Sequence, residues 1–374
     1  MNVFGSPAAG VVATLATLAV LAGPTTGGVR AQEPIAIGLV IPGPGPHAAI
    51  GAALREGAEL AVRRANEAGG FRGRPFVLRV VTDDGLWGQG LSRVTALAFT
   101  DPVAAVVGGA DGRGGHLIQQ VITKARLPFI TPWASDFTLS RGLIPWFFQA
   151  VPDDRAQARA VVTDAVAEGA GELLVLADTG YDARHFVMAV ERAAADAGIA
   201  ARVLAVEAWL SDSAPRPGER TAPELGGGEP PATAAAGTMV VLATTLDFGR
   251  RALQRLARLK PSPRVYIPLR LALPPVLGVT RAYPAPVLAP LPSGASLDAR
   301  DPGFRTLPAA FAHDATAAVI AAIRTAGPGP RDIRDALAAG TVDGVTGVLA
   351  FTASGRRSDA VRLQRVDGPA DRLP

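Results

Sequence analysis

The chain has 374 residues, of which 48% are hydrophobic and 19% are charged, so its composition excludes general disorder and allows two domains with full cores. The net charge is +4, but the arginines are scattered, and the absence of a long basic run argues against nucleic-acid binding. There is no cysteine, which excludes disulfides and a lipid-modified cysteine.

The first 31 residues have the pattern of a secretory signal peptide. An apolar stretch at 8–22 is followed by a polar spacer, and Val29 and Ala31 fit the small-residue rule for cleavage after Ala31. The apolar run is short for a membrane span of about 20 residues, so we expect an exported, periplasmic protein rather than one that keeps this segment as an anchor.

From residue 32 onward, apolar runs rich in β-branched residues alternate with helical periodicity. Residues 35–41, IAIGLVI, have no polar face, which is typical of a parallel strand covered by helices on both sides. Ile50, Leu54 and Ala58 recur at helical spacing in the next segment, and glycines at 69 and 70 end that helix. The cycle continues with expected strands at 75–82, 103–109 and 128–132 and helices at 90–100 and 114–127.

A second series follows the segment VPDD at 151–154. We expect helices at 156–170, 182–198 and 248–260, strands at 172–178, 201–209, 238–243 and 264–268, later helices at 309–325 and after 330–332, and paired strands around 353–356. Residues 211–237, rich in proline and glycine, interrupt this rhythm and predict a long flexible loop. Two βαβ series predict an α/β protein of two doubly wound, Rossmann-like lobes, with ligands beyond the carboxyl ends of the strands.

Sequence motifs of common enzymes are missing. The chain has no GxSxG, GxxxxGK[ST] or HExxH motif, and its four histidines lack metal-ligand spacing, so we expect no enzyme, cofactor or metal. Adjacent aspartates, Asp83 and Asp84, end the second strand. Neighbouring side chains on a strand point to opposite faces, so we favour capping of the next helix over an acid–base pair.

Several segments occur in a characteristic order. IGLVIPGPG is followed by ALREGAELAVRRANEAGGFRGRPFVLRVVTDDG, and then come VVGG, ARLPFITPWAS and TGVLAFTASGRRSD. This order resembles the type I periplasmic binding proteins of the branched-chain amino acid group, and the first block is the most specific part of the resemblance. The resemblance implies two lobes joined by a hinge. We place the N-terminal lobe at 32–151 and 272–357 and the C-terminal lobe at 152–271 and 358–374. It also implies a monomer that delivers a small ligand to an ABC transporter permease.

The resemblance places first-lobe ligand contacts in two loops. One contains Asp111, Gly112 and Arg113, where backbone N–H groups at a helix start attract carboxylates and Arg113 either clamps the ligand or is a solvated loop residue. In the other, Ala134 and Ser135 stand where the family holds an amino-acid head group. Trp133 beside them either stacks on an apolar ligand or packs in the core.

In the second lobe, Tyr181 matches a family aromatic residue and Thr245 stands where an aromatic residue is common. Arg270 falls where amino-acid binders of the family carry an acidic residue for the ligand ammonium, and a cation there would repel an ammonium. We therefore expect a small carboxylate with an apolar or aromatic body, with an aliphatic amino acid as the alternative ligand. A ligand-sensing module of the same fold that acts in signalling is the alternative function.

Overall fold

A computed structural model describes residues 33–83, 89–211, 238–293 and 304–366. The expected signal peptide, Asp84, nearly all of the proline- and glycine-rich loop and the last eight residues lie outside this part of the chain. Within the described residues, no helix has the length and apolar character needed to cross a membrane.

The first lobe is built on a five-stranded parallel sheet in the order β2-β1-β3-β4-β5. Its strands are β1 (Ile35–Ile41), β2 (Phe76–Thr82), β3 (Val106–Gly108), β4 (Phe129–Thr131) and β5 (Phe147–Gln149). Its helices are α1 (Ala48–Glu67), α2 (Gln89–Phe99), α3 (Gly112–Ala125), α9 (Leu307–Ala326) and α10 (Pro330–Ala339), with the short 3-10 helix η1 (Phe137–Ser140) and the hairpin β11 (Thr341–Gly344) and β12 (Gly347–Ala350).

The second lobe contains a six-stranded sheet in the order β13-β10-β9-β8-β6-β7, in which only the β10–β13 pair is antiparallel. The strands are β6 (Glu172–Ala177), β7 (Ala200–Ala205), β8 (Met239–Ala243), β9 (Arg264–Tyr266), β10 (Val287–Pro292) and β13 (Val361–Arg365). The helices are α4 (Asp154–Ala167), α5 (Tyr181–Asp196), α6 (Val206–Ser211), α7 (Leu246–Leu256) and α8 (Pro274–Thr280), with the 3-10 helix η2 (Leu269–Leu271). The predicted pair of doubly wound α/β lobes is confirmed.

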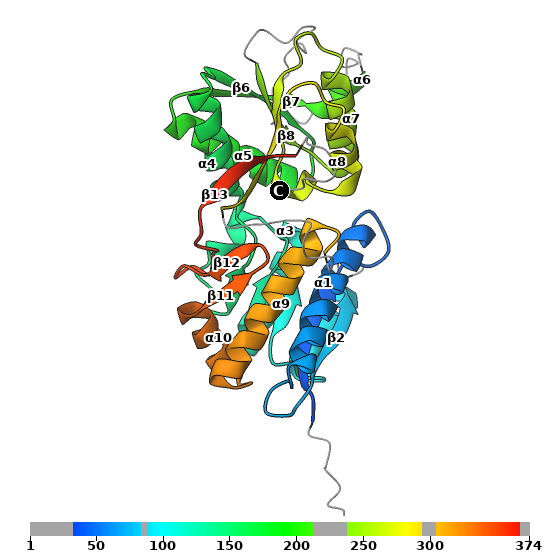
Figure 1. The fold of residues 1–374 in the computed structure, drawn as a ribbon, viewed down its shortest axis with the longest axis vertical. Coiled ribbons are helices and arrows are strands. Elements are labelled where there is room, and N and C mark those ends of the chain that lie inside the picture. Colours follow the sequence, from blue (N-terminus) through cyan, green and yellow to red (C-terminus); the bar gives the residue numbers. More distant parts are fainter. Residues whose placement is uncertain (1–32, 84–88, 212–237, 294–303, 367–374) are drawn as a thin grey trace, which may run out of the picture. The chain divides into compact units, whose positions relative to one another are not determined.

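Helices α1 and α9, far apart in the sequence, pack side by side in the first lobe (Figure 1). The predicted apolar positions Ile50, Leu54 and Ala58 are buried on α1. The two backbones approach so closely at Gly57 that an added Cβ atom would lie 1.9 Å from the carbonyl oxygen of Ala309. This contact depends on glycine and on the alanine-rich face of α9.

Three expected elements differ from the structure. The strand expected at 201–209 ends at Ala205, and the chain turns into α6, which buries Trp209 against α7. The strands expected around 353–356 pair through only one bridge, Phe351–Arg357, whereas the regular hairpin lies earlier, in β11 and β12. The segment assigned to the first lobe from residue 272 is wrong up to Pro292, because β10 hydrogen-bonds to β9 and β13 of the second sheet.

Two of the segments that connect the lobes are joined to each other by arginine side chains. Arg357 is buried and donates hydrogen bonds to the carbonyl of Ala150 and to the carboxylate of Asp359, one residue in each connection. Arg356 forms an ion pair with Asp153, with 3.3 Å between Nη1 and Oδ2. Residues 150–153 and 356–359 therefore form one cross-linked hinge element.

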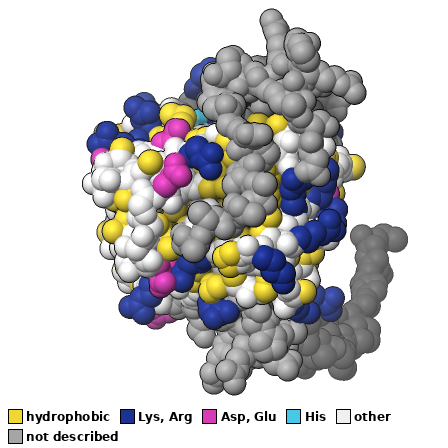
Figure 2. All heavy atoms as spheres, turned by 90° about the horizontal axis from the view of Figure 1, so that it is seen from above, with side chains coloured by type: hydrophobic (Ala, Val, Ile, Leu, Met, Phe, Trp, Pro, Cys, Tyr) yellow, Lys and Arg dark blue, Asp and Glu magenta, His cyan; other side chains and the backbone are white. Residues whose placement is uncertain are grey.

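Charged residues are dispersed over the surface. Figure 2 shows one face on which arginine and lysine side chains alternate with apolar and uncharged ones, as expected from the scattered arginines of the sequence.

Candidate binding site between the lobes

The N-terminus of α3 in the first lobe meets the start of α5 in the second lobe. Asp111 is the N-cap of α3, and its Oδ1 accepts a hydrogen bond of 2.7 Å from the Gly114 amide. The next amide, that of Gly112, donates across to Oδ1 of Asp182 at 3.0 Å. The Gly112 N–H, which was expected to bind a ligand carboxylate, is thus hydrogen-bonded to the carboxylate of Asp182.

Gly112 lies in a narrow space at the start of α3, with atoms of both lobes close to it. A Cβ atom at this position would lie 2.7 Å from Oδ2 of Asp136 and 2.7 Å from Cε1 of Tyr181. Those two side chains also contact each other, since the Tyr181 hydroxyl donates to Oδ2 of Asp136 at 3.1 Å. Arg113 is exposed, and its guanidinium lies 5.4 Å from the centre of the Tyr181 ring, as a cation–π contact rather than a buried clamp.

Asp136 is a buried carboxylate held by several donors. His116 lies 3.3 Å from its Oδ2, and Thr138 donates to it through both its amide and its hydroxyl. Burial acts to raise the pKa of Asp136, but the hydrogen bonds from His116 and Thr138 outweigh it and lower the pKa below its usual value. Burial, with Asp136 as the second cause, raises the pKa of Tyr181 to about 12, so Tyr181 stays a neutral donor.

Ser135 and Asp154 form a second buried polar pair. The Ser135 hydroxyl donates to Oδ1 of Asp154 at 2.7 Å, and the Asp154 side chain is fully buried at the start of α4. Burial raises the pKa of Asp154 well above its usual value, although Arg270 and Ser135 act in the opposite direction. Burial therefore disfavours the charged form of Asp154 relative to an exposed aspartate.

Arg270 lies on η2, among the carboxyl groups of the second lobe. Its Nη1 donates to the carbonyl oxygen of Asp182 at 3.3 Å, and its guanidinium lies 5.5 Å from the centre of the Phe186 ring. Its charge acts to lower the pKa of both Asp154 and Asp182, yet burial is the larger cause and raises both. No acidic residue stands immediately beside Arg270 in the sequence, but the fold supplies two of them in space.

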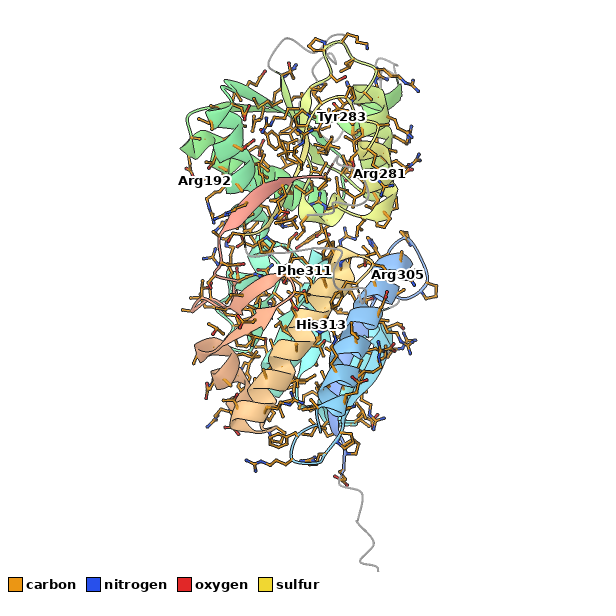
Figure 3. All side chains as sticks on the ribbon, viewed as in Figure 1. Arg192, Arg281, Tyr283, Arg305, Phe311 and His313 are labelled. Carbon is orange, nitrogen blue, oxygen red and sulfur yellow. The ribbon has the colours of Figure 1, made fainter. Side chains whose placement is uncertain are left out.

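Three of the expected site residues contact the protein itself. Trp133 is 2% exposed and packs edge-on against Phe311, with 5.8 Å between the ring centres, so its side chain packs in the core of the first lobe. Phe311 lies on α9 (Figure 3). Ala134 is fully buried, and its carbonyl accepts a hydrogen bond from Gln149. Thr245 is the exposed N-cap residue of α7, and its amide donates to Oδ2 of Asp178.

The structure thus brings together Gly112, Arg113, Tyr181 and Arg270, with Ser135 linked to them through Asp154. The sequence analysis did not select the three carboxylates Asp136, Asp154 and Asp182 as site residues. Asp136 directly follows TPWAS, Asp154 is the last residue of the boundary VPDD, and Asp182 is the last residue of DTGYD. For Asp136 and Asp182, an acidic residue a few positions after a predicted strand was the available signal.

Several buried polar atoms have no hydrogen-bond partner among the described residues. They include Oδ2 of Asp154 and Nη2 of Arg270, together with Nε1 of Trp133, Oγ1 of Thr244 and Oγ1 of Thr306. These five residues follow the strands β4, β5, β8 and β9 or, as with Thr306, precede α9. Within the described chain, no group of three or more acidic or histidine residues is arranged to hold a metal ion.

Comparison with known proteins agrees with this architecture. Residues 34–211 match the model of a periplasmic binding protein family. The chain has the type I periplasmic binding protein fold, and its resemblance to the branched-chain amino acid group of these proteins is confirmed.

One similar sequence is the Leu/Ile/Val-binding protein homolog 3 of Brucella melitensis, 32% identical over 136 residues, which are 36% of each chain. The match therefore spans about a third of the length of that relative.

Solved structures resemble the chain over most of its length. A substrate-binding protein of an ABC transporter from Desulfitobacterium hafniense, in complex with Leu, is 19% identical, with a TM-score of 0.68 over 91% of this chain and 99% of that one. A solute-binding protein from R. palustris in complex with benzoate is 15% identical, with a TM-score of 0.70 over 90% and 94%. A leucine-binding protein from Thermotoga maritima is 13% identical, with a TM-score of 0.70 over 88% and 97%.

Proposed function

We propose that this protein is the extracytoplasmic substrate-binding protein of an ABC importer and captures a small carboxylate between its lobes. The proposal rests on the two-lobed fold, on the sequence match over residues 34–211 and on the solved relatives that hold Leu or benzoate. Closure of two lobes around a ligand would exclude water from the polar contacts and give a permease one liganded shape to recognise.

The unpartnered Nη2 of Arg270 is the observation that carries the choice of ligand. A buried guanidinium N–H needs an acceptor, and a ligand carboxylate would supply one through a charge-assisted hydrogen bond. Asp154 does not supply this acceptor, since within the described residues its Oδ2 also has no hydrogen-bond partner. The positive charge of Arg270 would repel a ligand ammonium, which favours an acid without an ammonium group over a zwitterion.

Apolar residues stand next to Arg270 in the chain, and an aromatic or aliphatic ligand body would suit such surroundings. Leu269 and Leu271 flank Arg270 on η2, and Leu269 packs in the same core as Trp133 and Phe311 of the first lobe. Pockets for small ligands generally combine such an apolar wall with a few oriented polar groups.

Calorimetric titration of residues 32–374 with a matched set of ligands tests the proposal. The set consists of benzoate and 4-hydroxybenzoate, benzamide as the uncharged analogue, and leucine and isoleucine. We expect benzoate to bind and benzamide not to bind, and Arg270→Gln to weaken benzoate at least about tenfold. Asp247→Asn, a change to an exposed carboxylate on α7, is the control and leaves the affinity unchanged.

The two classes of ligand give opposite results. Binding of leucine alone, with no loss in Arg270→Gln, would contradict the role given to Arg270 and favour the amino-acid alternative. Binding of none of these acids by refolded, ligand-free protein would remove the support for the ligand class as a whole.

A further inference from the structure

Direct contacts join the two lobes at α3 and α5. The Gly112 amide of α3 donates to Asp182 of α5, and the Tyr181 hydroxyl of α5 donates to Asp136, just before η1. Aromatic contacts accompany them, with 6.1 Å between the ring centres of Phe137 and His185.

Asp182 accepts hydrogen bonds from residues of both lobes. Its carboxylate accepts from the first lobe, and its backbone carbonyl accepts from Arg270 within the second lobe. It is the second residue of α5, so its position is fixed by the helix. A carboxylate at the positive end of α3 is held by an N–H group and by the helix dipole together.

We propose that Asp182 is a resident substitute for the ligand carboxylate, which holds the lobes together in the free protein and competes with acidic ligands. The part concerning competition rests on the proposed function, whereas the contact between the lobes does not. Asp182 then sets specificity in two ways: it partly closes the empty protein, and an acid that binds at α3 must displace it.

Distance measurement between spin labels tests the contact directly. The chain has no cysteine, so Lys124→Cys on α3 and Gln254→Cys on α7 provide two unique, exposed labelling sites in different lobes. The protein is unfolded and refolded first, which removes any co-purified ligand, and pulsed electron resonance then gives the distribution of distances.

Three variants separate the hydrogen bond from other effects. Asp182→Ala removes the acceptor, and we expect the ratio of closed to open molecules to fall about tenfold. Asp182→Asn keeps an amide oxygen that accepts from Gly112 and should retain the closed population. Asp196→Ala, which removes an exposed carboxylate from the last turn of the same helix, is the matched control.

The outcomes separate this proposal from the proposed function. Unchanged distances in Asp182→Ala, or equal opening in Asp182→Asn and Asp182→Ala, would overturn the hydrogen-bonded contact, whatever the ligand proves to be. If benzoate binds, Asp182→Ala should bind it about tenfold more tightly, and equal affinity would overturn the competition. Failure of every ligand to bind would instead count against the proposed function, because the distances in the free protein do not depend on it.

Discussion

Replacing Gly112 by alanine should act as a wedge between the lobes. The added Cβ atom would lie 2.7 Å from atoms of Asp136 and Tyr181, whereas ordinary contacts of this kind are at least 3.4 Å. A displacement of about 0.7 Å is needed, and overpacking of this size costs about 1–3 kcal/mol. Tyr181 belongs to the second lobe, so the part of this cost that comes from Tyr181 disappears when the lobes separate, whereas the contact with Asp136 stays within the first lobe.

The expected result of Gly112→Ala is an open protein that remains folded. Gly112 is the first residue of α3 and has no left-handed backbone conformation, so alanine is compatible with the helix start itself. Distances between spin labels at positions 124 and 254 measure the opening, and calorimetry measures the free energy of unfolding. Gly278→Ala on α8, where an added Cβ would have no atom within 4 Å, is the control. Distances identical to those of the unmodified protein would refute the reasoning.

Three further changes probe the buried groups. Burial raises the pKa of Asp154. Between the usual pKa of an aspartate and this raised pKa, the folded chain binds more protons than the unfolded chain, so the free energy of unfolding should fall as the pH rises through this interval. The melting temperature of Asp154→Asn relative to the unmodified protein should therefore rise between pH 5 and pH 8, and a constant difference would contradict this. Gly57→Ala should destabilise the first lobe by about 1–3 kcal/mol or more in a denaturant titration, because the new Cβ would meet the backbone oxygen of Ala309, which cannot rotate away. An unchanged midpoint of unfolding would disprove the close packing of the two helices. Trp133→Ala should cost about 3–5 kcal/mol of stability, because it removes the partner of Phe311, and a stable variant with only weaker ligand binding would show that the indole contacts the ligand instead.

Periodicity in the sequence predicts most of the fold because burial follows local pattern. The apolar run 35–41 correctly predicts a buried strand, and the spacing of Ile50 and Leu54 correctly predicts a helix with one buried face. The assignment of residues 272–292 was wrong because it depends on which sheet a strand joins. That choice is set by pairing with β13, about 70 residues later, and local pattern contains no information on it.

The candidate site could be predicted only in part for a related reason. The resemblance placed Asp111 and Gly112 in a loop before the helix predicted at 114–127, and the structure starts α3 two residues earlier, at Gly112, with Asp111 as its N-cap. Arg270 meets Asp182, which lies 88 residues earlier, so its electrostatic environment depends on the fold and not on its neighbours in the chain. The ligand role of Arg270 inferred from the sequence therefore remains a proposal, whereas the nearby carboxyl groups are a finding.

The cross-linked hinge restricts the kind of movement that the lobes can make. Arg356 and Arg357 join two connecting segments to each other at Asp153 and Ala150, so the two segments must bend together. Two coupled segments allow rotation about one axis but resist twisting of one lobe relative to the other and sliding of one lobe past the other. The lobes should therefore open along a single arc, and α3 and α5 would meet in the same register each time they close.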